Sequence, residues 1–479
     1  MIVEDLIYLS LLLFSMGFGV YYRTIENPDS KKKIGALVGF FIVFIVSGFH
    51  SLHVLISTFV NACIILYTDK RKCHIYSFLF SFLYLFFFRT TIYFGIPYPP
   101  SHTNLIQMML TLKIIGIAFE VNASFVSKKK KDTANKTEEE RLQDELCNID
   151  VQFLDVFYYI YNYCGVLTGP YFRYRTFLDH LYKPYHEYDD YKTAMLKILY
   201  LVPLLGGIHV FTNYYWPISY VLTEEFESRS FLYRYWYIWP SFLIFRTRIY
   251  LGLILTEMVC IMGGLGVYPV LSKPRSGHGP TENFKTLKEL TKPEDLKNIE
   301  YNYETIRCVN PYESDFTPTM REAMKHWNIT IQYWLATYIY KRFPFKKLRT
   351  EVTMFMSAVW HGVYMGYYVC IATVPFALLY EDVWVKLLLK DNSGLPLKLS
   401  KLLLLFLKMQ MFSYQATAFV LLEVRKIYNY YNSVYHCVPI LYIGLYFLGK
   451  YLLKQKRLKE IKSGQEYDIG EEQVKPKVS

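Results

Sequence analysis

A single histidine, His361, stands in the middle of a long apolar run of the sequence. The run covers residues 352–379 and contains no Asp, Glu, Lys or Arg. As a helix rising about 1.5 Å per residue it would be roughly 40 Å long, enough to cross a hydrocarbon core of about 30 Å. His361 would lie roughly 15 Å inside, near the bilayer midplane, where an ionisable group is costly and indicates a functional site. The structural alternative is a neutral histidine that hydrogen bonds a neighbouring helix.

Upstream of this run, Asn328 is a second polar residue in apolar surroundings. It lies in the segment 324–342, MKHWNITIQYWLATYIYKR, whose apolar residues recur at helical spacing while Asn328 and Gln332 fall on a separate polar ridge. The apolar part, 327–340, is too short to cross a membrane unless it is tilted or buried. The pattern therefore predicts that a short helix carries Asn328 into the membrane.

Together these two residue types could catalyse acyl transfer. A neutral imidazole can remove a proton from an alcohol, and an asparagine amide can donate to a developing oxyanion or hold an acyl carbonyl. No serine with an acidic partner lies beside His361 in the sequence, so a covalent acyl-enzyme is not indicated. Direct attack of an alcohol on a thioester fits these parts. A packing histidine and a structural asparagine would give the same pattern.

The composition requires many more apolar helices around these two. The 479 residues are 53% hydrophobic, 18% aromatic and only 20% charged. This indicates an all-α, polytopic transmembrane helical bundle with about ten to twelve spans. The stretch 151–168 is shorter and reads as a re-entrant or interfacial helix. Candidate spans lie at residues 5–22, 34–49, 51–68, 75–96, 104–121, 194–216, 229–264, 352–379, 399–424 and 436–453.

The net charge of +12 does not indicate a nucleic-acid partner, because the basic residues cluster at the ends of the apolar runs. By the positive-inside rule these clusters are cytosolic and the N-terminus is lumenal. In the C-terminal third, the number of spans places every basic cluster in the cytosol only if one segment is broken or enters and leaves the membrane on the same side.

The polar segments are too small to form a separate soluble domain. We therefore expect one membrane domain, 1–453, with polar loops at 122–150 and 272–321, followed by a polar tail, 454–479. The eight cysteines show no paired Cys/His spacing, so no metal site is indicated.

Two motifs resemble those of the membrane-bound O-acyltransferase family. The stretch from Trp327-Asn328 to Gln332-Tyr333-Trp334-Leu335 resembles the family's asparagine motif, and Ser357–Tyr368, SAVWHGVYMGYY, resembles its histidine motif. Further stretches are similar to the lysophosphatidylinositol acyltransferases within the family: Phe82–Arg89, Thr168–Asp179, Phe245–Tyr250 and Glu300–Asn310. Two departures, Tyr364-Met365 in place of His-Pro and His326 in place of an aromatic residue, flank the two polar residues and put only fine substrate preference in doubt.

The resemblance implies a helical fold around an internal reaction chamber, in an enzyme of the endoplasmic reticulum membrane that uses acyl-CoA as co-substrate and no cofactor. It would transfer an acyl group, typically polyunsaturated such as arachidonoyl, to the sn-2 hydroxyl of lysophosphatidylinositol. His361 would be the general base and Asn328 would position the acyl group or the hydroxyl. The alternatives are another lysophospholipid headgroup, or a proton-coupled transporter that uses His361 as a relay.

Other residues are candidates for binding the substrates. Arg173 and Arg175 could bind the headgroup phosphate, with interfacial anchoring as the alternative. Lys341 and Arg342 could bind the phosphates of coenzyme A, with topogenic charges as the alternative. Gln332 is a further candidate on the polar ridge of Asn328. A weak dilysine-like signal at Lys475 and Lys477 agrees with the endoplasmic reticulum.

Overall fold

The computed structural model describes residues 2–130, 137–146, 148–290, 292–390 and 396–462. In these residues the chain is almost wholly helical, and two short strands, β1 (Tyr268–Pro269) and β2 (Tyr301–Asn302), pair in antiparallel fashion. The prediction of an all-α fold is confirmed. The dilysine-like residues, and the tail beyond residue 462, lie outside the described residues.

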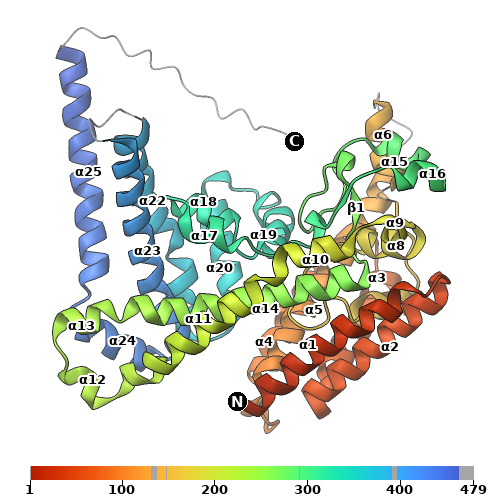
Figure 1. Cartoon of the computed structure of the whole chain (residues 1–479), viewed down its shortest axis with the longest axis horizontal. Helices are drawn as coiled ribbons and strands as arrows, with labels where there is room; N and C mark the ends of the chain where they lie inside the picture. The colour runs from red at the N-terminus through yellow and green to blue at the C-terminus, as the bar shows by residue number, and fades with distance from the viewer. Residues whose placement is uncertain (1, 131–136, 147, 291, 391–395, 463–479) are drawn as a thin grey trace.

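The N-terminal helices form one end of the molecule (Figure 1). Asn27 ends the turn after the first helix and caps the second, because its side chain accepts hydrogen bonds from the backbone N–H groups of Asp29 and Ser30 and Pro28 fits the first helical position. The fifth helix is buried over most of its length and is the centre of this half. The five helices are α1 (Ile2–Arg23), α2 (Pro28–Ser47), α3 (Ser51–Tyr67), α4 (Cys73–Arg89) and α5 (Ser101–Lys130).

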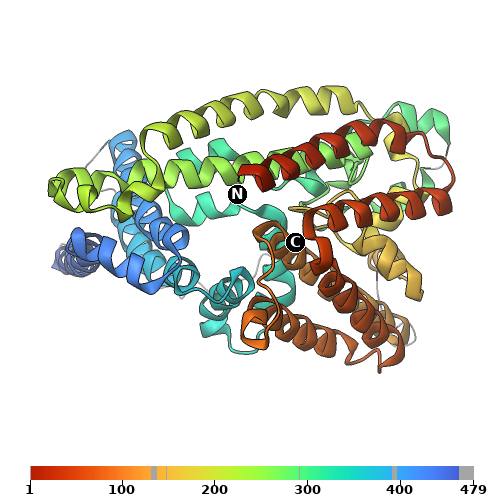
Figure 2. The same cartoon turned by 90° about the horizontal axis from the view of Figure 1, so that it is seen from below.

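Two long helices of the middle segment, α11 and α14, run side by side and connect the two ends of the molecule (Figures 1 and 2). Helix α14 packs against α1 at one end and against α23 at the other. The helices of this segment are α6 (Glu138–Leu146), α7 (Phe153–Ile160), α8 (Tyr174–Tyr182), α9 (Tyr185–Tyr188), α10 (Tyr191–Leu199), α11 (Leu201–Tyr215), α12 (Glu224–Ser228), α13 (Phe231–Trp236) and α14 (Ile238–Gly263).

The C-terminal part holds a group of short helices followed by a second bundle, in which α22 packs against α25. The short helices are α15 (Phe284–Glu289), α16 (Pro293–Lys297), α17 (Pro311–Phe316), α18 (Met320–Lys325), α19 (Ile329–Leu335), α20 (Arg349–His361) and α21 (Met365–Tyr367). The bundle is built from α22 (Val374–Val385), α23 (Leu397–Leu421), α24 (Val424–Ser433) and α25 (Cys437–Lys462).

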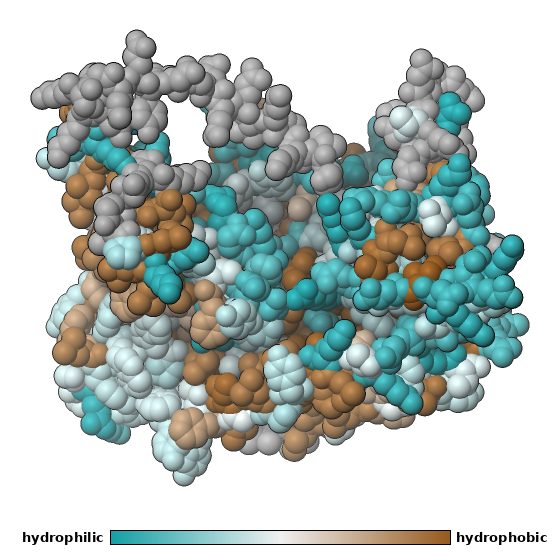
Figure 3. Space-filling model, turned by 45° about the horizontal axis from the view of Figure 1, so that its top comes forward, coloured by the Kyte–Doolittle hydropathy of each residue, from teal (hydrophilic) through white to brown (hydrophobic). Residues whose placement is uncertain are grey.

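Six helical stretches in the described residues are long and apolar enough to cross a membrane: Glu4–Arg23, Pro28–Tyr67, Ser101–Lys129, Tyr191–Leu222, Met365–Leu389 and Cys437–Leu458. The further spans expected near α4, α14 and α23 form helices that are shorter or carry more charge. Apolar residues cover much of the lower edge of the molecule, whereas hydrophilic residues gather on the upper right (Figure 3). The chain is therefore a multi-pass membrane protein.

The prediction of one continuous span over residues 352–379 is wrong. Helix α20 ends at His361, and Gly362 interrupts the helical conformation. The next candidate span starts at Met365. Gly362 is buried, and a Cβ there would clash with the ring of Tyr367, so the close turn requires glycine. A broken segment in this third of the chain agrees with the charge pattern.

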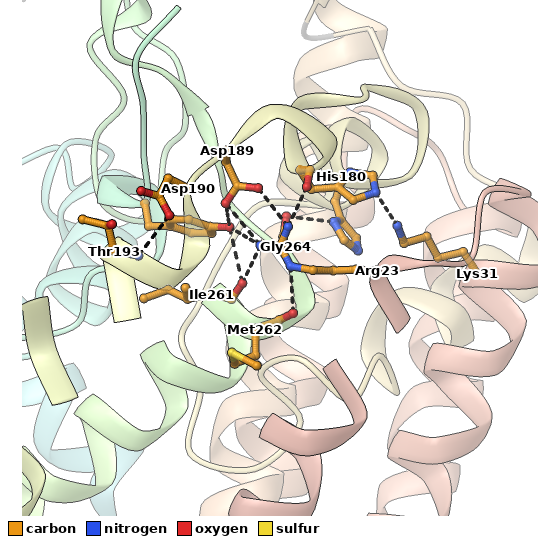
Figure 4. A network of polar contacts seen from close by, with 11 residues as sticks. Arg23, Lys31, His180, Asp189, Asp190, Thr193, Ile261, Met262 and Gly264 are labelled. Carbon is orange, nitrogen blue, oxygen red and sulfur yellow. Dashed lines mark hydrogen bonds and ion pairs between the residues drawn. The ribbon is translucent and has the colours of Figure 1, made fainter. Parts of the chain in front are cut away.

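A buried polar network joins α1 and α2 to α9 and to the C-terminal end of α14 (Figure 4). The Arg23 guanidinium forms an ion pair of 2.8 Å with Asp189 and donates to the carbonyl groups of Ile261 and Met262 at the end of α14. Lys31 Nζ lies 2.8 Å from Nε2 of His186. These contacts satisfy carbonyls at a helix C-terminus and join α14 to the N-terminal helices.

Candidate active site

Asn328 and His361 line one cavity of about 330 Å³ between α14, α19, α20 and α23. Its walls are mostly apolar and aromatic, including Phe245, Trp327 and Phe419. Such a cavity can hold an acyl chain, and its few polar groups can fix the orientation of a substrate. The fold thus brings together the two residues that the sequence had marked separately.

The backbone of Asn328 adopts a left-handed conformation, with φ of 48°, directly before α19. The expectation of a helix that carries Asn328 within it is wrong, because the segment breaks between α18 and α19 and Asn328 lies in the break. Asparagine tolerates this conformation better than most residues. Its carbonyl oxygen accepts the first hydrogen bond of α19, from the N–H of Gln332 at 2.9 Å.

Hydrogen bonds from both sides fix the turn of Asn328. The side-chain amide of Gln332 donates to the carbonyl groups of Met324 and Trp327. The N–H of Ile329 donates to the Cys308 carbonyl at 2.7 Å. Gln332 also lines the cavity, but its amide nitrogen supports the turn, and its predicted contact with substrate stays a prediction.

The segment around Cys308, which contacts the Asn328 turn, is itself hydrogen bonded to α14. The buried carboxylate of Glu257 accepts hydrogen bonds from the backbone N–H groups of Cys308 and Val309. Arg246 of the same helix lies 3.3 Å from the Asp315 carboxylate and does not pair with Glu257. Helix α14 therefore supports the asparagine turn as well as the cavity wall.

His361 is the last residue of α20 and is surrounded by aromatic rings. The centroid of its imidazole lies 4.8 Å from that of Trp360 and 5.2 Å from that of Phe419. None of the described residues forms a hydrogen bond with the imidazole, so its nitrogen atoms are available to a substrate in the cavity. The alternative of a histidine that hydrogen bonds a neighbouring helix is not what the structure shows.

A buried arginine from the other half of the chain, Arg89, caps the helix that carries His361. Its guanidinium donates to the carbonyl groups of Val359 at 3.0 Å and Trp360 at 2.6 Å, and its Nε donates to Asn104 at 2.9 Å. A cation at a helix C-terminus satisfies carbonyls that have no partner within the helix and interacts favourably with the helix dipole. Arg89 ends the similar stretch Phe82–Arg89, but nothing in the sequence indicated its partner.

Two tryptophans attach the site helices to α5. The indole N–H of Trp334 in α19 donates to the carbonyl of Leu112 at 2.9 Å, and that of Trp360 in α20 donates to the carbonyl of Met108 at 3.0 Å. Both tryptophans are buried in one apolar cluster with residues of α5. Buried indole groups are expected to find such partners.

The other predicted binding residues lie outside this cavity. Arg173 and Arg175 line a second, smaller pocket of about 40 Å³ together with His278 and Lys183. Burial, together with the nearby charge of Arg173, lowers the pKa of His278 to about 4. Their role in headgroup binding stays a prediction.

Lys341 and Arg342 follow the end of the α19 segment and are exposed. The Arg342 guanidinium lies over the ring of Phe119, 4.5 Å from its centroid. Neither residue lines the cavity, and their contact with coenzyme A stays a prediction.

A largely helical membrane fold in which an asparagine turn and a helix-terminal histidine line one apolar cavity is suited to a membrane-embedded enzyme. The sequence profile of the MBOAT, membrane-bound O-acyltransferase family, matches residues 52–398. The chain belongs to this family and is an O-acyltransferase. This finding replaces the alternative of a transporter.

Named relatives match almost the full chain. The membrane-bound acylglycerophosphatidylinositol O-acyltransferase frj of Drosophila melanogaster is 40% identical over 471 residues, covering 96% of this chain and 95% of the relative. The protein with the same descriptive name in Xenopus laevis, mboat7, is 36% identical, covering 95% of both chains. Human MBOAT7, also named an acylglycerophosphatidylinositol O-acyltransferase, is 34% identical, covering 93% of both chains.

Proposed function

We propose that the protein transfers an acyl group from acyl-CoA to the sn-2 hydroxyl of lysophosphatidylinositol in the membrane of the endoplasmic reticulum. The observation that carries the proposal is that His361 and Asn328, from two separate motifs, line one apolar cavity. The named relatives act on acylglycerophosphatidylinositol, which supports the choice of acceptor.

In the proposed reaction the imidazole of His361 takes the proton of the acceptor hydroxyl while its oxygen attacks the thioester carbonyl. The amide of Asn328 donates a hydrogen bond to the carbonyl oxygen as negative charge develops on it. The C–S bond then breaks, and the coenzyme A thiolate takes the proton from the imidazolium, which restores the enzyme. The apolar walls exclude water, which would otherwise compete with the acceptor hydroxyl.

The test is acyl transfer by membranes that contain the full chain, measured for lysophospholipids with different headgroups. We expect lysophosphatidylinositol to react fastest, and His361→Ala to lower kcat by about 100-fold or more, the usual contribution of a general base. The matched control is His50→Ala, which changes a histidine outside the cavity and should retain activity.

Two results would contradict the proposal. Equal rates with lysophosphatidylcholine would remove the inositol assignment, and near-normal turnover in His361→Ala would remove the histidine from its role.

A further inference from the structure

A second large hollow lies against another face of α14, next to the face that lines the active-site cavity. This groove, between α11, α13 and α14, has a volume of about 650 Å³. Phe242 and Phe245 of α14 face the cavity, whereas Leu243 and Arg246 of the same helix line the groove. The two spaces therefore lie against adjacent faces of one helix.

The walls of the groove fit a lipid chain. Three tryptophans line it, Trp216, Trp236 and Trp239, and the rings of the first two lie 5.7 Å apart. The opposite wall is α11, which belongs to a candidate span of which only 6% of the most apolar window is buried. A helix so poorly covered by protein faces the bilayer, so the groove is accessible to lipid.

Arg246 supplies the one cation among the residues that line the groove. Its Nε lies 3.3 Å from the Asp315 carboxylate as an ion pair, but this buried atom has no well-aligned hydrogen bond. The Nη1 group also lies 4.0 Å from the sulfur of Met409 as a weak hydrogen bond. The remaining N–H groups of the terminal nitrogen atoms are suited to the phosphate of a lipid headgroup.

The pair of Arg246 and Asp315 also connects the groove to the active site. Asp315 lines the cavity, and the hydroxyl group of Tyr250, another cavity residue, donates to it at 2.7 Å. The ring centroid of Tyr250 lies 5.2 Å from that of Trp327, the neighbour of Asn328. A phosphate held by Arg246 would thus lie at the wall of the cavity.

We propose that this groove is the membrane-side binding site from which the acceptor lysophosphatidylinositol reaches the cavity. Its acyl chain lies along the tryptophans and its phosphate binds Arg246. The inference rests on the proposed function, since it concerns the acceptor of that reaction. The net negative charge of this headgroup complements Arg246, whereas the choline of a zwitterionic headgroup would oppose it.

The chain offers a matched pair of glycines for the test. Gly206 and Gly207 are neighbours in α11, and an added Cβ meets no atom within 4 Å at either position, but only Gly207 lines the groove. With the purified full chain in lipid nanodiscs, we expect Gly207→Phe to raise the KM for lysophosphatidylinositol about tenfold, equivalent to about 1.4 kcal/mol of binding. The KM for acyl-CoA and the kcat should not change, and Gly206→Phe should behave like the unsubstituted chain.

A second pair tests the charge. Arg246→Gln should lower the preference for lysophosphatidylinositol over lysophosphatidylcholine about tenfold, the loss of one charge-assisted contact. Arg248→Gln is the control, because Arg248 is exposed, pairs with Asp5 at 3.1 Å and does not line the groove.

The outcomes separate the two proposals. If the unsubstituted chain acylates lysophosphatidylinositol but Gly207→Phe has the same acceptor KM as Gly206→Phe, the groove proposal is overturned and the proposed function stands. If the unsubstituted chain does not acylate lysophosphatidylinositol, both are overturned.

Discussion

Asn328 meets two separate requirements with one residue type. Its backbone takes a left-handed conformation that most side chains disfavour, and the residue lines the cavity. A left-handed residue other than glycine costs on the order of 1–3 kcal/mol and is characteristic of functional sites. Asparagine reduces this cost while it supplies a neutral hydrogen-bond donor.

Substitutions at this position can separate the two requirements. Asn328→Gly keeps the backbone conformation and removes the amide, so we expect a loss in kcat of about 100- to 1000-fold, as for other oxyanion donors, with an unchanged unfolding temperature. Asn328→Asp also tolerates the backbone but cannot donate when ionised, and it should be similarly inactive. The measurements are steady-state acyl transfer and thermal unfolding of the purified chain. A nearly active glycine variant would show that the amide is dispensable.

At the residue scale, the sequence pointed to the two polar residues that line the cavity. It did not point to Arg89, which holds the end of the helix that carries His361. His361 and Asn328 stand out because polar groups are rare in apolar surroundings. Arg89 contacts Trp360 from a position 271 residues away, and no local pattern reports such a pairing.

At the scale of elements, the ends of short helices determine the geometry of the site. Arg89 holds the last carbonyl groups of α20, directly before His361. A displacement of about 1 Å at a reacting group can cost about 100-fold in rate, so the position of this helix end matters for turnover.

We predict that Arg89→Gln lowers kcat at least about tenfold with little change in the KM of either substrate, because it moves the imidazole and leaves the cavity walls in place. Arg89→Lys keeps the charge but cannot bridge two carbonyl groups and Asn104, and it should restore part of kcat. Kinetics with each substrate varied in turn provide the measurement. A rise in KM with unchanged kcat would instead indicate a role in binding.

Two helices were expected to be continuous, over 324–342 and 352–379. The first is broken at Asn328 and the second directly after His361. Hydrophobic periodicity extends through both breaks, so the sequence could not place them. The breaks depend on tertiary contacts: the Cys308 carbonyl that accepts from Ile329, and the ring of Tyr367 against Gly362.

At the scale of the whole molecule, stability depends on buried charge between the N-terminal helices and α14. His186 lies outside the candidate spans and contacts both Lys31 and Arg23. The centroid of its ring lies 5.7 Å from that of His180. Burial, with the charges of Lys31 and Arg23, lowers the pKa of His186 to about 3.

This pKa predicts acid sensitivity. Above about pH 6.5, the usual histidine pKa, His186 is neutral in the folded and unfolded chains and contributes no pH dependence. As the pH falls from there toward 3, only the unfolded chain takes up the proton, so the free energy of unfolding decreases.

We therefore expect the unfolding temperature of the purified chain to fall between pH 7 and 5, and to fall less in His186→Gln, which keeps an acceptor for Lys31. Scanning fluorimetry at both pH values measures the difference. Equal slopes in the two proteins would assign the acid sensitivity to other groups.

The carbonyl groups of Leu112 and Met108 that receive the two site tryptophans are four residues apart on α5, about 6 Å along its axis. One turn of α5 thus sets the spacing between the helix that follows Asn328 and the helix that ends at His361. The connector at 341–348 is mostly exposed and takes no part in these two tryptophan contacts. The number of residues between the two motifs is therefore a poor guide to the distance between their side chains in space.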